Sequence, residues 1–147
     1  MALDHRPLAP DLAVAPQISE DDIAEAARLG YRTIINNRPD GEEPGQLTAA
    51  RAAEVAALHG LDYRHIPVNA QTMGPAVWRD FATALRDAPH PVLAHCRSGT
   101  RSTHLWAFQA AEGDALSLDE IVEHGARAGY DLEPLRPMLE RVRRGEA

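Results

Sequence analysis

Short apolar runs that alternate with helical patterns constrain the fold of this chain more than any other feature. Runs typical of strands occupy residues 12–15, 31–37, 62–68 and 91–95, and a segment with helical spacing of apolar residues follows each one. Parallel strands need a long crossover between them, usually a helix. The alternation therefore predicts an α/β fold with a mostly parallel central sheet of about four strands, flanked by helices.

The predicted helices have recognisable ends. Ser19 and Ser117 are suited to cap the first turn of a helix, and Gly30 and Gly60 stand where a helical pattern stops. The predicted helices cover residues 20–29, 48–59, 75–88, 102–111, 118–127 and 134–144.

The length of 147 residues fits one domain, which we expect to cover residues 1–147 with an N-terminal arm over residues 1–10. No apolar run is long enough to cross a bilayer, and the first residues lack the pattern of a secretory signal. We therefore expect a cytoplasmic protein that does not act at a membrane. The formal net charge of −7 argues against a nucleic acid as partner, because binding to a phosphate backbone usually needs a basic surface.

The chain has one cysteine, Cys96, at the junction between the strand-like residues 91–95 and the next helical pattern. A single cysteine excludes an internal disulfide and a zinc site with several cysteines. The spacing of the histidines also gives no sign of a metal site, so neither a metal nor another cofactor is predicted. Cys96 is then either an inert buried thiol or a reactive one.

The residues around Cys96, HCRSGTRS from 95 to 102, favour a reactive thiol. A loop between a strand and a helix presents successive backbone N–H groups that attract an anion, and the same groups favour a thiolate. We predict that Cys96 is the nucleophile and that Arg101 holds the anionic substrate. The other predicted anion-binding residues are Arg97, Ser98, Gly99, Thr100 and Ser102, with the Ser102 hydroxyl available to the sulfur or its ligand. Arg97, directly after the cysteine, can point outward to steer the substrate or simply be solvated, and the sequence favours neither. An inert cysteine would leave two arginines, a glycine and two serines without a role.

Four segments together carry a resemblance to a known family. HCRSGTRS resembles the active-site loop shared by protein-tyrosine-phosphatase-like and rhodanese-like enzymes. Preceded by LAVAPQIS, INNRPDGEEPGQ and HIPV, it resembles the phosphatase-like domain of the beta-lactamase-hydrolase-like proteins over residues 12–108. The resemblance implies a protein-tyrosine-phosphatase-like fold. Members of this family occur alone or fused to metallo-hydrolase domains related to persulfide dioxygenases.

Two departures from the phosphatase pattern bear on the reaction. Four residues separate Cys96 from Arg101, one fewer than in protein-tyrosine phosphatases, and rhodaneses are similar to this shorter spacing. Dual-specificity phosphatases place an aspartic acid, which protonates the leaving group, in the loop that corresponds to residues 69–74, and this loop has no carboxylate. Asp40 is a substitute by loop position, although an Asp-Gly turn is the stronger interpretation.

These departures favour a sulfurtransferase. Cys96 would take a sulfane sulfur from thiosulfate or from a persulfide such as glutathione persulfide, and a Cys96 persulfide would pass it to an acceptor thiol. The alternative is a protein-tyrosine or dual-specificity-like phosphatase that acts on a phosphoester through a Cys96 phosphocysteine. A third possibility, an anion-binding module without catalysis, has no need for the cysteine.

Two further residues are candidates for the site. Arg38 can add positive charge at its mouth, or form a surface ion pair with Glu42 or Glu43. His95 can help to hold the thiolate, or it can be a satisfied histidine at the end of a buried strand. The second interpretation is favoured for each.

Overall fold

A computed structural model describes residues 2–146 of the chain. Its elements are β1 (Arg6–Ala9), β2 (Leu12–Ala15), α1 (Glu20–Arg28), β3 (Thr33–Asn36), α2 (Ala49–Leu58), β4 (Asp62–His65), α3 (Pro75–Asp87), β5 (Val92–His95), α4 (Thr100–Glu112), α5 (Leu118–Arg127), the 3₁₀ turn η1 (Glu133–Leu135) and α6 (Arg136–Arg143).

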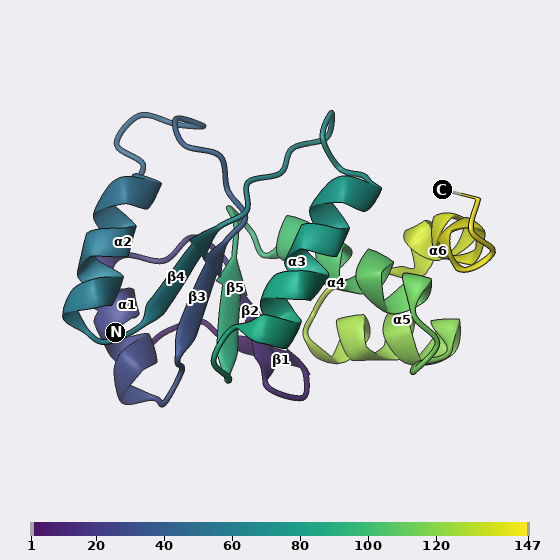
Figure 1. Ribbon diagram of the computed structural model, residues 1–147, viewed down its shortest axis with the longest axis horizontal. Coiled ribbons are helices and arrows are strands. Elements are labelled where there is room, and N and C mark those ends of the chain that lie inside the picture. Colours follow the sequence, from purple (N-terminus) through teal and green to yellow (C-terminus); the bar gives the residue numbers. More distant parts are fainter. Residues whose placement is uncertain (1, 147) are drawn as a thin grey trace.

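The strands form one sheet in the order β1-β2-β5-β3-β4 (Figure 1). β5 pairs in parallel with both β2 and β3, and β3 pairs in parallel with β4. The predicted α/β fold with a mostly parallel sheet is therefore confirmed. Because β5 lies between β2 and β3, the residue that follows it, Cys96, comes at the middle of the edge formed by the carboxyl ends of the strands.

The fifth strand lies where the sequence predicts only an arm. Within residues 1–10, Arg6–Ala9 forms β1 and pairs antiparallel with β2. A tight turn joins the two strands, with Asp11 at φ 63°. β1 has no alternating apolar pattern, and Pro7 is tolerated because the strand lies at the edge of the sheet. The pairing covers what would otherwise be an open edge of β2.

Several element boundaries also differ from the sequence prediction. β3 and β4 end at Asn36 and His65, before the predicted ends at residues 37 and 68. α4 begins at Thr100 instead of residue 102, directly after Gly99. None of the helices within residues 2–146 is both long and apolar enough to cross a membrane.

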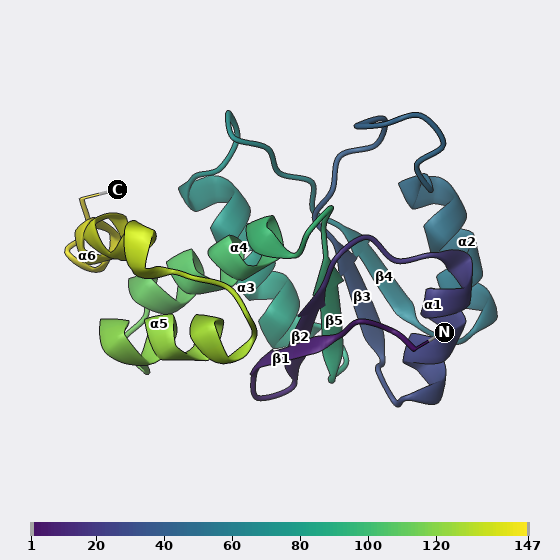
Figure 2. The same cartoon turned by 180° about the vertical axis from the view of Figure 1, so that it is seen from behind.

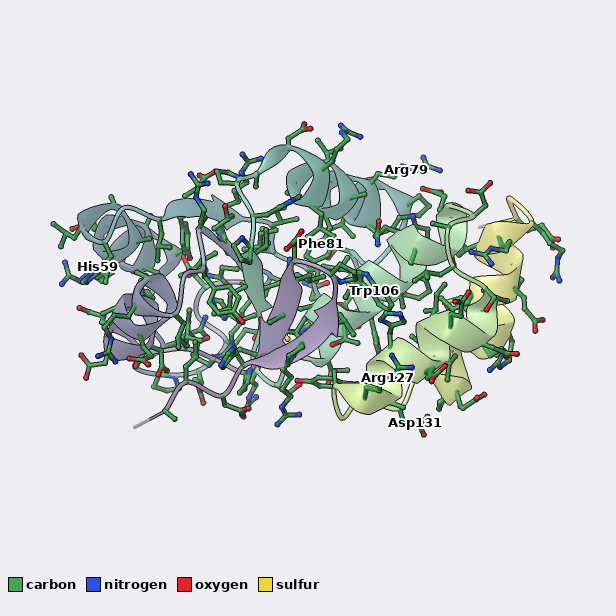
Figure 3. The ribbon with its side chains drawn as sticks, turned by 90° about the horizontal axis from the view of Figure 1, so that it is seen from below. His59, Arg79, Phe81, Trp106, Arg127 and Asp131 are labelled. Carbon is green, nitrogen blue, oxygen red and sulfur yellow. The ribbon has the colours of Figure 1, made fainter. Side chains whose placement is uncertain are left out.

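Helices cover both faces of the sheet (Figures 1 and 2). Ile34 and Leu93 pack with α1 and α2 on one face, whereas the adjacent Ile35 and Val92 pack with α3 and α4 on the other. Successive residues of a strand point to opposite faces, so one apolar run serves two cores. Figure 3 shows Phe81, from α3, and Trp106, from α4, directed into the interior of the second core. α5 and α6 lie outside α4 and extend this core.

Candidate active site

Cys96 begins the loop that joins β5 to α4, and we call residues 95–102 the Cys96 loop. Its side chain is buried, and the Gly99 N–H donates a hydrogen bond to Sγ at 3.1 Å. α4 begins at Thr100, so the free N–H groups of its first turn and the positive end of its dipole lie beside the loop. This arrangement stabilises negative charge at the sulfur and on any anion bound beside it.

Only glycine is compatible with position 99 of this loop. Its φ of 92° lies in the left-handed region that other residues rarely adopt. A Cβ at this position would also collide with the Tyr130 hydroxyl. Backbone conformation and the contact with Tyr130 thus impose the same residue.

The Arg101 guanidinium is held on two of its edges. Nη1 donates to Glu42 Oε2 at 2.8 Å and to the Val68 carbonyl at 2.9 Å, and Nη2 donates to Glu42 Oε1 at 2.8 Å. The hydrogen bonds that Arg101 donates to Glu42 raise the pKa of Arg101, and the charge of Cys96 contributes in the same direction. Within residues 2–146, Nε and the second N–H of Nη2 donate to no oxygen, and hydrogen bonding with the Cys96 side chain makes a further small contribution to the raised pKa of Arg101. That edge can bind two oxygens of an anion without displacing Glu42.

Glu42 is a site residue that the sequence prediction missed. It lies in the loop after β3, residues 37–47, which we call the Glu42 loop. Its carboxylate accepts hydrogen bonds from Arg101 and, at 2.8 Å, from Arg38 Nε. The bond from Arg101 has the largest effect, and together these bonds lower the pKa of Glu42 to about 2. Glu42 is therefore ionised at neutral pH. The available signal was the acidic pair Glu42–Glu43 in a loop that follows a strand.

Arg38 is neither at the mouth of the site nor on the surface. Its side chain is 0% exposed and donates to Glu42, to Glu43 at 3.3 Å and to Gln17 Oε1 at 3.1 Å. The predicted partners are therefore correct, but the predicted exposure is wrong. A buried guanidinium requires such partners, because an unpaired charge is costly away from water. Arg38 thus fastens the Glu42 loop to the body of the protein.

Asp40 stands in the Asp-Gly turn of the Glu42 loop. Its side chain is exposed, and its Oδ1 accepts a hydrogen bond at 2.9 Å from the N–H of Ala49, the first residue of α2. The Asp40 carboxylate therefore lies at the N-terminus of α2, where negative charge is favourable. The interpretation as a turn residue agrees with this geometry.

The remaining polar residues of the Cys96 loop divide into buried and exposed groups. The prediction offers the Ser102 hydroxyl to the sulfur or its ligand, but this buried hydroxyl donates its proton to Asn37 Oδ1 at 2.7 Å and so joins the two loops. Arg97 is exposed, and its Nη2 lies 3.9 Å from Glu43 Oε2. Ser98 and Thr100 are also exposed, with their hydroxyl oxygens 3.0 Å apart.

His95, at the start of the Cys96 loop, supplies no charge to the site. His95 is buried, and burial lowers its pKa to about 4, so the ring is neutral at pH 7. Its Nδ1 lies 3.4 Å from the Cys96 carbonyl oxygen. Across residues 2–146, no three His, Cys, Asp or Glu side chains are grouped so that they could hold a metal ion.

Known proteins share this sequence pattern. The family model described as "Beta-lactamase hydrolase-like protein, phosphatase-like domain" matches residues 4–113. The beta-lactamase hydrolase-like protein of Agrobacterium fabrum is 36% identical over 130 residues, which are 88% of this chain and 30% of that protein. The chain thus spans less than a third of the length of this relative.

Solved structures share the fold. A candidate phosphatase from Neisseria meningitidis is 34% identical, with a TM-score of 0.87 over 97% of this chain and 100% of that chain. The active form of Tk-PTP matches with a TM-score of 0.69 and 18% identity over 100% of both chains. These matches confirm the protein-tyrosine-phosphatase-like fold that the resemblance implies.

The comparisons show that the prediction of sulfur transfer is wrong, together with its sulfur donor and acceptor thiol. The matching family is a phosphatase-like domain, and the structure with 34% identity is that of a candidate phosphatase. The prediction depends partly on the four residues between Cys96 and Arg101, yet a chain with this spacing matches a phosphatase-like domain family. The spacing between Cys96 and Arg101 therefore does not separate the two chemistries by itself.

Proposed function

The chain belongs to the phosphatase-like domain family of the beta-lactamase hydrolase-like proteins, and from this premise we propose that it is a cysteine-dependent phosphatase acting on phosphate monoesters. The observation that carries the proposal is the pairing of a thiol with an anion-binding loop. The Gly99 N–H contacts Cys96 Sγ at 3.1 Å, and one edge of Arg101 is free to bind an anion.

The proposed reaction has two steps. Backbone N–H groups of the Cys96 loop and the free edge of Arg101 hold the phosphoryl oxygens. The Cys96 thiolate attacks phosphorus, an S–P bond forms, and the ester oxygen departs with the electrons of the broken P–O bond. Water then attacks the phosphocysteine, loses a proton to solvent, and releases inorganic phosphate and the thiolate.

The ionised state of Glu42 bears on which phosphoesters react fastest. With its pKa at about 2, Glu42 holds no proton to give to a departing oxygen at neutral pH. A leaving group that departs as a stable anion has the least need of a proton. We therefore propose aryl phosphates as the preferred substrates over alkyl phosphates.

The test is phosphate release from 4-nitrophenyl phosphate and from phenyl phosphate, with and without orthovanadate. We expect vanadate-sensitive release, faster with the 4-nitrophenyl ester, and a fall of at least about 1,000-fold in the Cys96→Ser variant. Arg79→Ala is the control, because Arg79 pairs with Glu112 on the outer surface of α3 and α4 (Figure 3). Release that is equally fast in Cys96→Ser, or no release above background, would overturn the proposal.

A further inference from the structure

One peptide unit of the Cys96 loop is held at both of its ends. The peptide between Ser98 and Gly99 is trans, so its C=O and N–H point in opposite directions within one rigid plane. The Gly99 N–H donates to Cys96 Sγ at 3.1 Å, and the Ser98 carbonyl accepts a hydrogen bond from the Tyr130 hydroxyl at 2.9 Å. A hydroxyl on the far side of the loop therefore fixes the direction of the N–H that faces the sulfur.

The turn after α5 brings Tyr130 to this position. Gly129, with φ 92°, reverses the chain, and the Tyr130 N–H donates to the Gly125 carbonyl at 2.8 Å. The Arg6 guanidinium lies over the Tyr130 ring, 5.2 Å from its centre, and Tyr130 is only 9% exposed. Figure 3 labels Arg127 and Asp131, which flank the turn. The ring is thus fixed on one side by β1 and at its tip by the loop.

The hydroxyl of Tyr130 remains a donor at neutral pH. Burial raises the pKa of Tyr130; nearby Arg6 lowers it, and the charge of Cys96 raises it. The proton is therefore retained, and the hydroxyl donates it to the Ser98 carbonyl.

Without this bond, the Ser98–Gly99 peptide has an alternative orientation. Glycine populates positive and negative φ about equally, so the peptide can rotate at little backbone cost. Rotation would turn the Ser98 carbonyl towards the sulfur and replace a hydrogen-bond donor with an acceptor. An acceptor at this point repels both a thiolate and a bound anion.

We propose that Tyr130 is a positioning residue that keeps the Gly99 N–H directed at Cys96, and thereby maintains the reactive thiolate and the anion site. The proposal deepens the proposed function and rests on it, because it concerns the same loop. Tyr130 lies outside residues 4–113, the part of the chain that the family model matches.

The test compares Tyr130→Phe with Tyr31→Phe in the full chain. Tyr31 is the matched control, because its hydroxyl bonds to His5 Nδ1 at 2.6 Å and not to the loop. The rate of iodoacetamide alkylation is measured against pH, and Cys96 is the one cysteine in the sequence that can react. We expect a 3- to 10-fold lower rate for Tyr130→Phe near neutral pH, roughly the loss of one hydrogen bond between neutral groups, with the rate profile moved to higher pH. Tyr31→Phe is expected to match the unchanged protein.

Other groups that act on Cys96 stay the same in both variants, namely the cation Arg101 on α4 and the neutral His95 on β5. Alkylation is measured far below the melting temperature of each variant, so a loss of stability does not enter the rate. A profile for Tyr130→Phe that coincides with that of Tyr31→Phe would overturn the inference. A second measurement is the affinity for orthovanadate, which is read from how strongly orthovanadate slows the alkylation. We expect this affinity to fall only in Tyr130→Phe.

Alkylation requires no phosphoester, so the two proposals can fail separately. A chain that releases no phosphate but shows the altered alkylation of Tyr130→Phe would overturn the proposed function and support the role of Tyr130. A chain that releases phosphate and is alkylated at equal rates with and without the Tyr130 hydroxyl would support the proposed function and overturn the role of Tyr130.

Discussion

Two loops at the same edge of the sheet form the candidate site by different means. The Cys96 loop contributes backbone N–H groups, a thiol and Arg101, all from consecutive residues. The Glu42 loop contributes side chains that orient Arg101, and it is itself fastened by the buried Arg38. The difference indicates that the half of the site proposed to bind the anion is local, whereas the half that orients Arg101 depends on contacts between distant segments.

Lowering the pH should destabilise the two loops in different pH ranges. Among the predicted changes, acidification has the largest expected effect on stability. Burial lowers the pKa of His95 to about 4, below its unfolded value of about 6.5. The unfolded chain therefore gains a proton first, and stability falls as the pH drops from about 6.5 to 4, by about 3 kcal/mol in order of magnitude. Glu42, with a pKa of about 2, loses its contribution only as the pH falls from about 4.5 towards 2.

Urea denaturation at several pH values measures both effects. A His95→Gln variant is expected to lose the stability change between about pH 6.5 and 4 and to keep the change at lower pH. If the dependence of stability on pH is unchanged in His95→Gln, the buried neutral His95 is not the cause of the stability lost between about pH 6.5 and 4.

Arg101→Lys tests the forked contact between the loops. A lysine keeps the charge but cannot bind Glu42 with two nitrogens and an anion with another edge, so we expect a fall of about 100-fold in kcat/KM for an aryl phosphate. Arg79→Lys is the control, because Arg79 binds both oxygens of Glu112 away from the site. Equal activities of the two variants would mean that charge alone suffices at Arg101.

Glu42→Gln tests the orienting loop by itself. The change leaves Arg38 and Arg101 with a neutral partner, and we expect kcat/KM to fall about tenfold, together with a larger loss of stability than in Glu112→Gln. Steady-state kinetics and urea denaturation check both. A gain in affinity for phosphate in Glu42→Gln would instead show that this carboxylate competes with the substrate for Arg101.

Asp40→Ala has the smallest expected effect on activity. Its carboxylate accepts from the N–H of Ala49, so we expect a loss of about 1 kcal/mol in stability and a change of less than about twofold in kcat. Thr48→Ala removes another cap of the same helix and should behave alike. A selective loss of activity on phenyl phosphate in Asp40→Ala would mean that Asp40 supplies a proton after all.

Much of the fold was open to prediction from local patterns. The alternation of strands and helices, the serine caps of α1 and α5, and the position of Cys96 between β5 and α4 all depend on residues close together in the chain. β1 was not predictable in this way, because it is supported by pairing with β2 and by packing against α5, which is distant in the chain.

By itself, the sequence determined the chemistry of the Cys96 loop: a thiol, a glycine and an arginine between a strand and a helix. Only the tertiary structure decided how these groups are oriented. Glu42 is 59 residues from Arg101 in the chain, and Tyr130 is 32 residues from Ser98. Such contacts follow from the strand order and from the turn after α5, which bring distant segments together, and no local pattern of residues encodes that placement.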